Sequence, residues 1–261
     1  MDTARDSGKH TIDLNADLGE GFGPYRLGAD AALMPVLTSA NIACGFHAGD
    51  PMTMRETVAA AASHGVAIGA HPGYPDLLGF GRRDLAATPS EITAYVIYQI
   101  GALDAVCRAS GTKLRYVKAH GALYNRAATD RVAADAIADA IRRVDPALVM
   151  LGLSGSALIA AGDAAGLRTA SEAFADRAYA SDGTLVPRSV AGAVVHDTGA
   201  VVARALRMVT TGVVATIDGT DIAVRADSLC VHGDTPGALE LVRALRTHLD
   251  HHGVRVASFV R

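Results

Sequence analysis

The sequence lacks tryptophan and has few other aromatic residues. Of its 261 residues only 5% are aromatic, whereas 50% are hydrophobic by a count that includes alanine. Alanine, valine, leucine and glycine therefore supply most of the small and apolar side chains. A core of this kind is typical of a parallel sheet that is covered by alanine-rich helices.

An excess of charge of either sign is also missing. The chain has 24 lysine and arginine residues against 27 aspartate and glutamate residues, which gives a formal net charge of -3. This balance provides neither a basic surface for nucleic acid nor a polybasic anchor for a membrane. No apolar run is long enough to cross a bilayer. We therefore expect neither kind of partner.

Cysteine is scarce, and its spacing fits neither a metal site nor a disulfide framework. The three cysteines are Cys44, Cys107 and Cys230. An odd number without an apolar leader argues against a secreted, disulfide-linked protein, so we expect the reducing cytoplasm. Cys44 and Cys230 fall within strand patterns, which favours small buried residues over nucleophiles.

Several short motifs are absent as well. Neither the GxxxxGK[ST] nor the GxGxxG pattern of nucleotide-binding proteins occurs, and neither HxxxH nor HExxH marks a zinc site. Any nucleotide or metal must therefore be bound by residues that are distant in the sequence.

Histidine, in contrast, recurs in one setting. Four short apolar runs each end on a histidine that has a glycine one or two residues after it: His47, His71, His120 and His232. After the first run, Asp50 and Pro51 have the residue types of a helix N-cap and a first helical position. This succession of strand, polar tip and helix predicts a βα unit.

The same unit recurs along the chain without an intervening linker. Residues 1–10 are polar and patternless, so we expect a flexible tail followed by a single domain over residues 11–261. The predicted strands cover residues 12–17, 41–47, 66–71, 115–120, 148–153, 167–174 and 228–232. The predicted helices cover residues 30–37, 52–64, 92–109, 130–144, 198–211 and 236–251, a further helix starts at residues 154–156, and a hairpin lies at 213–224. The pattern predicts an irregular seven-stranded parallel (β/α) barrel, with a doubly wound open sheet as the alternative.

Polar residues gather at the predicted strand ends. In the first strand, alternation places Asp13, Asn15 and Asp17 on one face. Because parallel strands end at the same face of a barrel, one site is predicted from the following residues: Asp17, His47, His71, Lys118, His120 and Glu172. The amides of a helix N-terminus add a predicted co-substrate site at His232, Gly233 and Asp234.

Three loops accompany this predicted site. Residues 18–23 are rich in glycine, residues 72–83 end on the pair Arg82 and Arg83, and residues 175–197 form an unusually long connection. We expect the second to be an active-site loop and the third to cover the site. The arginine pair either binds an anion or lies in solvent.

Two kinds of chemistry fit these residues. Asp17, His47 and His71 could bind a divalent metal, but the missing zinc motifs favour metal-free acid–base catalysis. In that case a carboxylate acts as the base, imidazoles donate protons and Lys118 stabilises a developing anion. We assign no metal ligand from the sequence, and the need for a divalent metal stays open.

Seven stretches together resemble a known family. In chain order they are residues 14–23, 40–51, 70–76, 79–83, 117–125, 172–179 and 230–236. They include Asn41-Ile-Ala-Cys-Gly-Phe-His47 and Lys118-Ala-His-Gly-Ala-Leu-Tyr124. The sequence is similar to the LamB/YcsF family from about Ile12 to its C-terminus.

The resemblance implies a fold and an activity. The fold is an irregular (β/α) barrel like that of the glycoside hydrolase and deacetylase superfamily. The family supplies the A component of 5-oxoprolinase, which is a hydrolase acting on a cyclic amide. With partner subunits B and C, it opens the lactam of 5-oxo-L-proline to L-glutamate while ATP is hydrolysed to ADP and phosphate.

Roles for the site residues follow as hypotheses from this reaction. Asp17 or Glu172 would be the base, His71 and His120 the proton donors, and Lys118 would neutralise a phosphate or oxyanion. ATP would bind either to this chain or to one of its partners. The alternatives are a metal-dependent deacetylase acting on a sugar amide and a non-catalytic chain that only binds the lactam. Self-association is also left open.

Overall fold

The computed structural model describes residues 10–231 and 237–260. Its strands are β1 (His10–Leu18), β2 (Ser39–Ala43), β3 (Ala67–His71), β4 (Leu114–Lys118), β5 (Val149–Leu153), β6 (Thr169–Phe174), β7 (Val213–Ala215), β8 (Asp221–Ala223), β9 (Ser228–Cys230) and β10 (Val254–Val256). Its helices are α1 (Asp30–Leu33), the 3-10 turn η1 (Met34–Val36), α2 (Pro51–His64), α3 (Pro89–Ala109), α4 (Gly121–Thr129), α5 (Arg131–Val144), α6 (Ala157–Ala164), α7 (Thr198–Thr211) and α8 (Ala238–His251).

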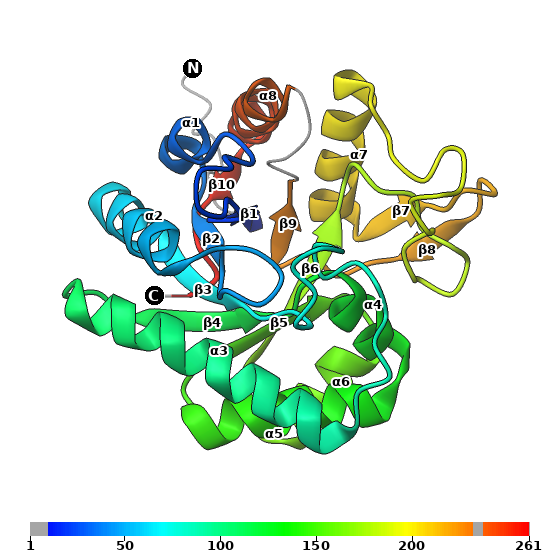
Figure 1. The fold of residues 1–261 in the computed structure, drawn as a ribbon. Helices are drawn as coiled ribbons and strands as arrows, with labels where there is room; N and C mark the ends of the chain where they lie inside the picture. Colours follow the sequence, from blue (N-terminus) through cyan, green and yellow to red (C-terminus); the bar gives the residue numbers. More distant parts are fainter. Residues whose placement is uncertain (1–9, 232–236, 261) are drawn as a thin grey trace.

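The strands form a closed barrel (Figure 1). Parallel strands are hydrogen-bonded in the order β10-β1-β2-β3-β4-β5-β6-β9, and a further pairing between β9 and β1 closes a ring of seven. The helices surround this ring, and the antiparallel β7–β8 hairpin lies beside α7. The predicted seven-stranded parallel barrel is confirmed, and the open-sheet alternative is excluded.

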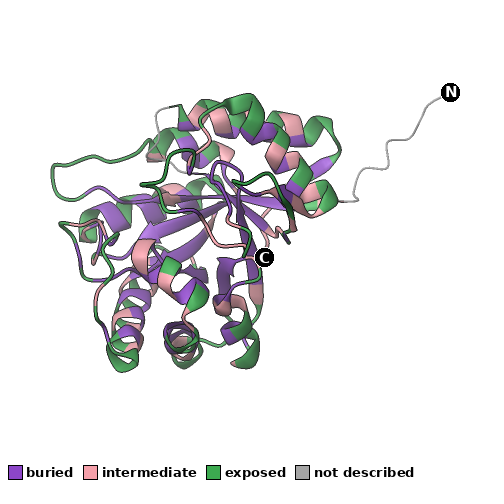
Figure 2. Ribbon diagram, turned by 90° about the vertical axis from the view of Figure 1, so that its right-hand side faces the viewer, coloured by how far each residue is buried: buried purple, intermediate pink, exposed green. Residues whose placement is uncertain are grey.

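Alternation along the strands separates the main core from the barrel interior. The outward residues of β1, Ile12, Leu14 and Ala16, are fully buried against the surrounding helices. The helices turn their buried sides to the strands and their exposed sides to solvent (Figure 2). Aliphatic packing between barrel and helices therefore fixes the direction of every strand.

The barrel interior is divided into a polar half and an apolar half. Strands β1, β2 and β9 turn polar side chains inward, namely Asp13, Asn15, Asp17, Ser39, Asn41 and Ser228. Strand β5 turns Val149 and Leu151 inward, and these pack with Tyr116 and Val260. The inward polar row predicted for the first strand is confirmed. Buried polar side chains of this kind need hydrogen-bond partners inside the protein, and the partners of this row extend to the ends of the strands.

Local signals account for several element boundaries. The Asp50 side chain accepts hydrogen bonds from the amides of Met52 and Thr53, so the predicted N-cap is confirmed. Thr88 and Glu91 form a reciprocal capping box at the start of α3. Helix α7 has the predicted bounds, and the predicted hairpin forms.

The structure corrects three expectations. Strand β2 ends at Ala43, because Gly45 has a φ of +93° that interrupts the extended backbone, so His47 lies in the loop beyond the strand. Strand β4 ends at Lys118, and His120 is the N-cap residue of α4, a helix that the sequence did not predict. The expected helix over residues 30–37 is a single turn that continues as η1.

At the N-terminus, β1 begins at His10, one residue before the predicted domain boundary. Within the described residues, no helix is both long and apolar enough to cross a membrane.

Candidate functional site

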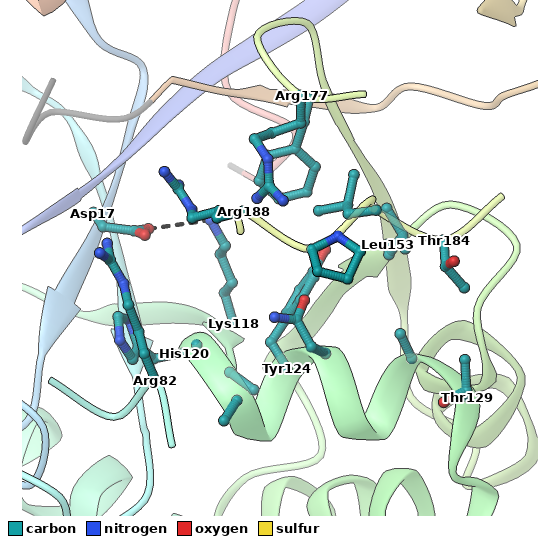
Figure 3. A pocket seen from close by; sticks show the side chains of 18 of the residues that line it. Asp17, Arg82, Lys118, His120, Tyr124, Thr129, Leu153, Arg177, Thr184 and Arg188 are labelled. Atoms are coloured by element: carbon teal, nitrogen blue, oxygen red, sulfur yellow. Dashed lines mark hydrogen bonds and ion pairs between the residues drawn. The ribbon is translucent and has the colours of Figure 1, made fainter. Parts of the chain in front are cut away.

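The predicted strand-end residues converge on one cavity of about 520 Å³ at the C-terminal face of the barrel. Asp17, His71, Lys118 and His120 line it, and His47 contacts the two lining histidines with its ring. Figure 3 shows Asp17, Arg82, Lys118 and His120 at one end of this pocket, with Thr129 and Thr184 at the other. The predicted residues His232, Gly233 and Asp234 lie outside the described part of the chain.

Lys118 joins the two predicted carboxylates beneath the cavity. Its Nζ lies 2.8 Å from Oε1 of Glu172 and 3.1 Å from Oδ1 of Asp17. It also contacts Oδ1 of Asn15 at 3.3 Å and Sγ of Cys230 at 3.2 Å. Burial opposes the charge on Lys118, but the neighbouring acidic groups prevail and hold its pKa well above the usual range.

The two carboxylates differ in their access to the cavity. The Asp17 side chain is 19% exposed, whereas the Glu172 side chain is 0% exposed. Burial would raise the pKa of Asp17, but His71 and Lys118 outweigh this effect and hold it well below the usual value. Glu172 is held by the hydroxyl of Tyr124 at 2.8 Å and the amide of Asn15 at 3.0 Å. Asp17 is therefore the carboxylate that a ligand in the cavity can reach.

A chain of amides inside the barrel orients Asp17. The Asn41 amide donates to Oδ1 of Asp17 at 2.8 Å and to Oδ1 of Asn15 at 2.7 Å. The hydroxyl of Tyr116 donates to Oδ1 of Asn41 at 2.7 Å. Sequence reasoning did not assign these three supporting residues to the site. Their inward positions on β1, β2 and β4 were the available signal.

Three histidines meet at the cavity edge beside Asp17. Nε2 of His71 lies 3.3 Å from Oδ2 of Asp17 and 2.9 Å from Nδ1 of His120. The ring of His47 stacks on that of His120, with a centroid distance of 3.7 Å and an interplanar angle of 5°. Burial, reinforced by the neighbouring histidines, lowers the pKa of His47 well below its usual value and that of His120 to about 3. Both imidazoles are therefore neutral near pH 7.

Glu20 belongs to this group, although sequence reasoning did not select it. Its Oε1 lies 3.3 Å from Nε2 of His47 and 3.5 Å from Nδ1 of His120. Glu20 lies in the predicted glycine-rich loop and is 7% exposed. A carboxylate between two glycines, just beyond Asp17, was the available signal. Ligand atoms of Glu20, His47, His71 and His120 all lie within 4.8 Å of one another, which makes these residues the best candidate metal ligands.

Two of the three predicted loops, residues 72–83 and residues 175–197, frame the cavity. In the loop over residues 72–83, Arg82 lines the cavity, whereas Arg83 forms an ion pair with Asp76. The long connection over residues 175–197 contributes the following lining residues: Arg177, Asp182, Thr184, Leu185, Pro187 and Arg188. Lys118 and three arginines therefore surround the cavity, which favours an anionic ligand.

The cysteines are buried and unreactive. All three are free thiols, and burial raises the pKa of Cys44 to about 12 and that of Cys230 well above its usual value. Neither has the thiolate character of a nucleophile.

Comparison with known proteins shows similarity over nearly the whole chain. The model of the LamB/YcsF family matches residues 12–261. A protein of Syntrophobacter fumaroxidans, named as the A subunit of 5-oxoprolinase, is 54% identical over 246 residues, which cover 94% of this chain and 97% of the relative. A protein of Geobacillus kaustophilus with the same name is 55% identical over 246 residues, covering 94% and 96%.

Solved structures show the same architecture. The lactam utilization protein of Thermus thermophilus superposes with a TM-score of 0.91 at 49% identity, covering 95% of this chain and all of that one. A putative cellobiose-phosphate cleavage protein of Enterococcus faecalis superposes with a TM-score of 0.56 at 13% identity, covering 96% and 98%. The second likeness concerns the fold alone.

Proposed function

Because this chain belongs to the LamB/YcsF family, we propose that it acts as the A subunit of an ATP-dependent 5-oxoprolinase. The reaction opens the lactam of 5-oxo-L-proline to L-glutamate and hydrolyses ATP to ADP and phosphate. Relatives that are more than half identical over nearly their whole length are named as this subunit of 5-oxoprolinase. The similar solved structure is that of a lactam utilization protein.

The chemistry of the substrate explains the need for ATP. Amide resonance makes an unstrained lactam a poor electrophile. Transfer of the γ-phosphoryl group to the lactam oxygen yields an O-phosphorylated imidate and ADP. Water can then add to the ring carbon, and protonation of the ring nitrogen allows the C–N bond to break. The resulting acyl phosphate loses phosphate to a second water molecule, which leaves glutamate.

One observation carries the catalytic part of this proposal. Asp17, an ionised carboxylate, lies 3.1 Å from the buried ammonium group of Lys118 on the floor of a cavity that three arginines surround. A base and a fixed positive charge are thus next to each other where a phosphorylated, anionic lactam would bind. Positive groups arranged before the reaction stabilise developing negative charge without reorganisation.

Each group then has a role in the proposed reaction. Asp17 takes the proton of the attacking water, and Lys118 neutralises the phosphate or oxyanion. Glu172 holds Lys118 in place from below as a positioning residue. His71, with His120 hydrogen-bonded to it, delivers the proton to the leaving ring nitrogen.

Partner subunits and ATP belong to the same proposal. The word subunit in the relatives' names supports assembly with other chains, and we propose partners equivalent to subunits B and C. The reaction requires ATP as a co-substrate, and either this chain or a partner binds it. We place the complex in the cytoplasm, where ATP is available.

The decisive experiment reconstitutes this chain with the two partner proteins and measures glutamate and phosphate with 5-oxoproline and ATP. Asp17→Asn and His120→Ala should each lower glutamate formation on the order of 100-fold or more, because proton transfer is impaired. Asp104→Asn and His64→Ala, which change helix residues away from the cavity, are the matched controls and should retain activity.

Two results would contradict the proposal. The first is full activity of both site variants, which would remove the catalytic roles. The second is unchanged turnover by the partner proteins without this chain, which would remove its place in the reaction. Circular dichroism of each variant establishes that the barrel is folded.

A further inference from the structure

The hydrogen bonds of the histidine cluster fix where its protons lie. Nδ1 of His71 is 2.8 Å from the carbonyl oxygen of Lys118. Nε2 of His120 is 2.8 Å from the carbonyl oxygen of Phe80. A carbonyl oxygen can only accept a hydrogen bond, so both of these ring nitrogens must carry their proton.

This arrangement leaves two lone pairs facing each other. In a neutral imidazole that is protonated at one nitrogen, the other nitrogen is an acceptor. If both rings are neutral, Nε2 of His71 and Nδ1 of His120 are these acceptors, and they lie only 2.9 Å apart. Carboxylate oxygens of Asp17 and Glu20 lie 3.3 and 3.5 Å from these two nitrogens. Four electron-rich atoms at such distances are stable together when a cation, either a proton or a metal ion, lies among them.

The surroundings have the features of a metal site. Histidine ligands of metals usually donate their other N–H to a backbone carbonyl or a carboxylate, as His71 and His120 do here. His47 lacks this arrangement: it is 0% exposed, and among the described residues nothing forms a hydrogen bond with its Nδ1. A Cβ atom at Gly81 would lie 2.7 Å from Cβ of His47 and 2.8 Å from Cδ2 of His120, so a glycine there allows the rings to converge.

We propose that Glu20, His71 and His120 bind one divalent transition-metal ion of the zinc type at the cavity edge. His47 is not a ligand, because its ring stacks in parallel on that of His120 and its lone pair cannot point at the same ion. Two imidazoles and a carboxylate, with a fourth position open, are a donor set that zinc uses in catalytic sites. Tetrahedral bonds of 2.0–2.1 Å separate neighbouring ligand atoms by about 3.3 Å. The separations of 3.5 Å from Glu20 to His120 and 2.9 Å from His71 to His120 are close to this value.

This site differs from the set Asp17, His47 and His71 that the sequence suggested. Glu20 and His120 take the places of Asp17 and His47, because Asp17 remains bonded to Lys118 and Asn41 and the His47 ring is stacked on that of His120. An ion at this point would occupy the lone pairs of His71 and His120, so it would act by polarising a carbonyl or phosphoryl oxygen in the cavity, in place of the proton delivery assigned to these histidines above. That role rests on the proposed function, whereas the existence of the site does not.

The test measures metal binding directly. The full chain, without an affinity tag, is stripped with a chelator and titrated with Zn²⁺, and bound metal is measured by mass spectrometry. One equivalent per chain is expected. Co²⁺ should give the visible absorption of an ion bound by nitrogen and oxygen in a four- or five-coordinate site. Failure of this test would leave the 5-oxoprolinase assay with the partner proteins unaffected.

Variants locate the ion. His71→Gln, His120→Gln and Glu20→Gln should each weaken Zn²⁺ binding on the order of 100-fold or more, because each removes a ligand. The competing surface site is a pair on α8 and at its C-cap, the half-buried His248 and the exposed His252, with ring centroids 4.2 Å apart. The double variant His248→Ala/His252→Ala should still bind one equivalent of Zn²⁺ per chain and give the same Co²⁺ spectrum as the unmodified chain.

The proposal is overturned by either of two results. One is substoichiometric binding by the unmodified chain at saturating Zn²⁺, which would make a shared proton the cation between His71 and His120. The other is binding that is lost in the α8 double variant and kept in His71→Gln.

Discussion

At the scale of single residues, the molecule stabilises buried charge in two ways. Lys118 and Glu172 neutralise each other with a separation of 2.8 Å. Asp13 lies deeper in the barrel, and within the described part of the chain its carboxylate has only hydroxyl partners: Thr38 and Ser39 donate to it at 2.5 and 2.6 Å, and Ser228 donates to its other oxygen. Hydroxyl groups compensate less for a buried charge than an ammonium group does. Burial therefore raises the pKa of Asp13 from 3.8 to about 6 despite these bonds.

The raised pKa of Asp13 predicts a pH-dependent stability. Between about pH 4 and pH 6 the folded chain holds a proton that the unfolded chain has lost, so stability falls as pH rises through this window. Asp13→Asn removes this effect. Its free energy of unfolding, relative to the unmodified chain, should rise by up to about 3 kcal/mol between pH 4 and pH 7. Urea unfolding at intervals of one pH unit measures this difference, and a constant difference would refute the pKa assignment.

At the scale of elements, neighbouring strands are matched in side-chain size. Gly69 of β3 pairs with Tyr116 of β4, whose ring crosses the space above the glycine to reach Asn41. A Cβ atom at Gly69 would lie 2.2 Å from that ring. Because Gly69 has no side chain, the hydroxyl group of Tyr116 can reach the Asn41 amide, and this amide in turn holds Asp17.

Two glycine substitutions separate this packing effect from backbone effects. Gly69→Ala should displace Tyr116 and lower the free energy of unfolding by about 1–3 kcal/mol, because an overpacked interior cannot relax. Gly101→Ala is the control, since Gly101 is exposed on α3 and a Cβ there meets nothing within 4 Å. It should raise stability by about 0.5–1 kcal/mol through helix propensity. Thermal and urea unfolding compare the two, and equal effects would argue against the packing explanation.

At the scale of the whole molecule, the barrel has an open end and a closed end. The cavity occupies the C-terminal face, whereas the last described residues of the chain pack against the opposite end. Strand β10 pairs with the first residues of β1. Beyond it, the ring of Phe259 lies 5.1 Å from that of Tyr116, and Val260 packs with Val149 and Leu151. The C-terminal segment therefore closes the apolar half of the interior.

A matched pair of valine substitutions tests this closure. Val260→Ala should lower the free energy of unfolding by about 1–2 kcal/mol, because it removes buried methyl groups beneath the barrel. Val132→Ala changes a valine that is 58% exposed and should stay within about 0.5 kcal/mol of the unmodified chain. Urea unfolding gives both values. An equal loss of unfolding free energy in the two variants would show that the C-terminal segment contributes no buried apolar packing.

The sequence by itself determined the barrel, the inward polar row of β1 and the approach of Asp17, His71, Lys118 and His120. These features depend on alternation along one strand and on the common direction of parallel strands, which are local properties that a pattern can carry. Only the tertiary structure decided the positions of His47 and Glu20, because both lie in loops whose paths depend on packing. It alone brought Asn15 to Glu172, across 157 residues of chain. Partners so distant in sequence leave no periodic signal, since closure of the barrel is what makes them neighbours.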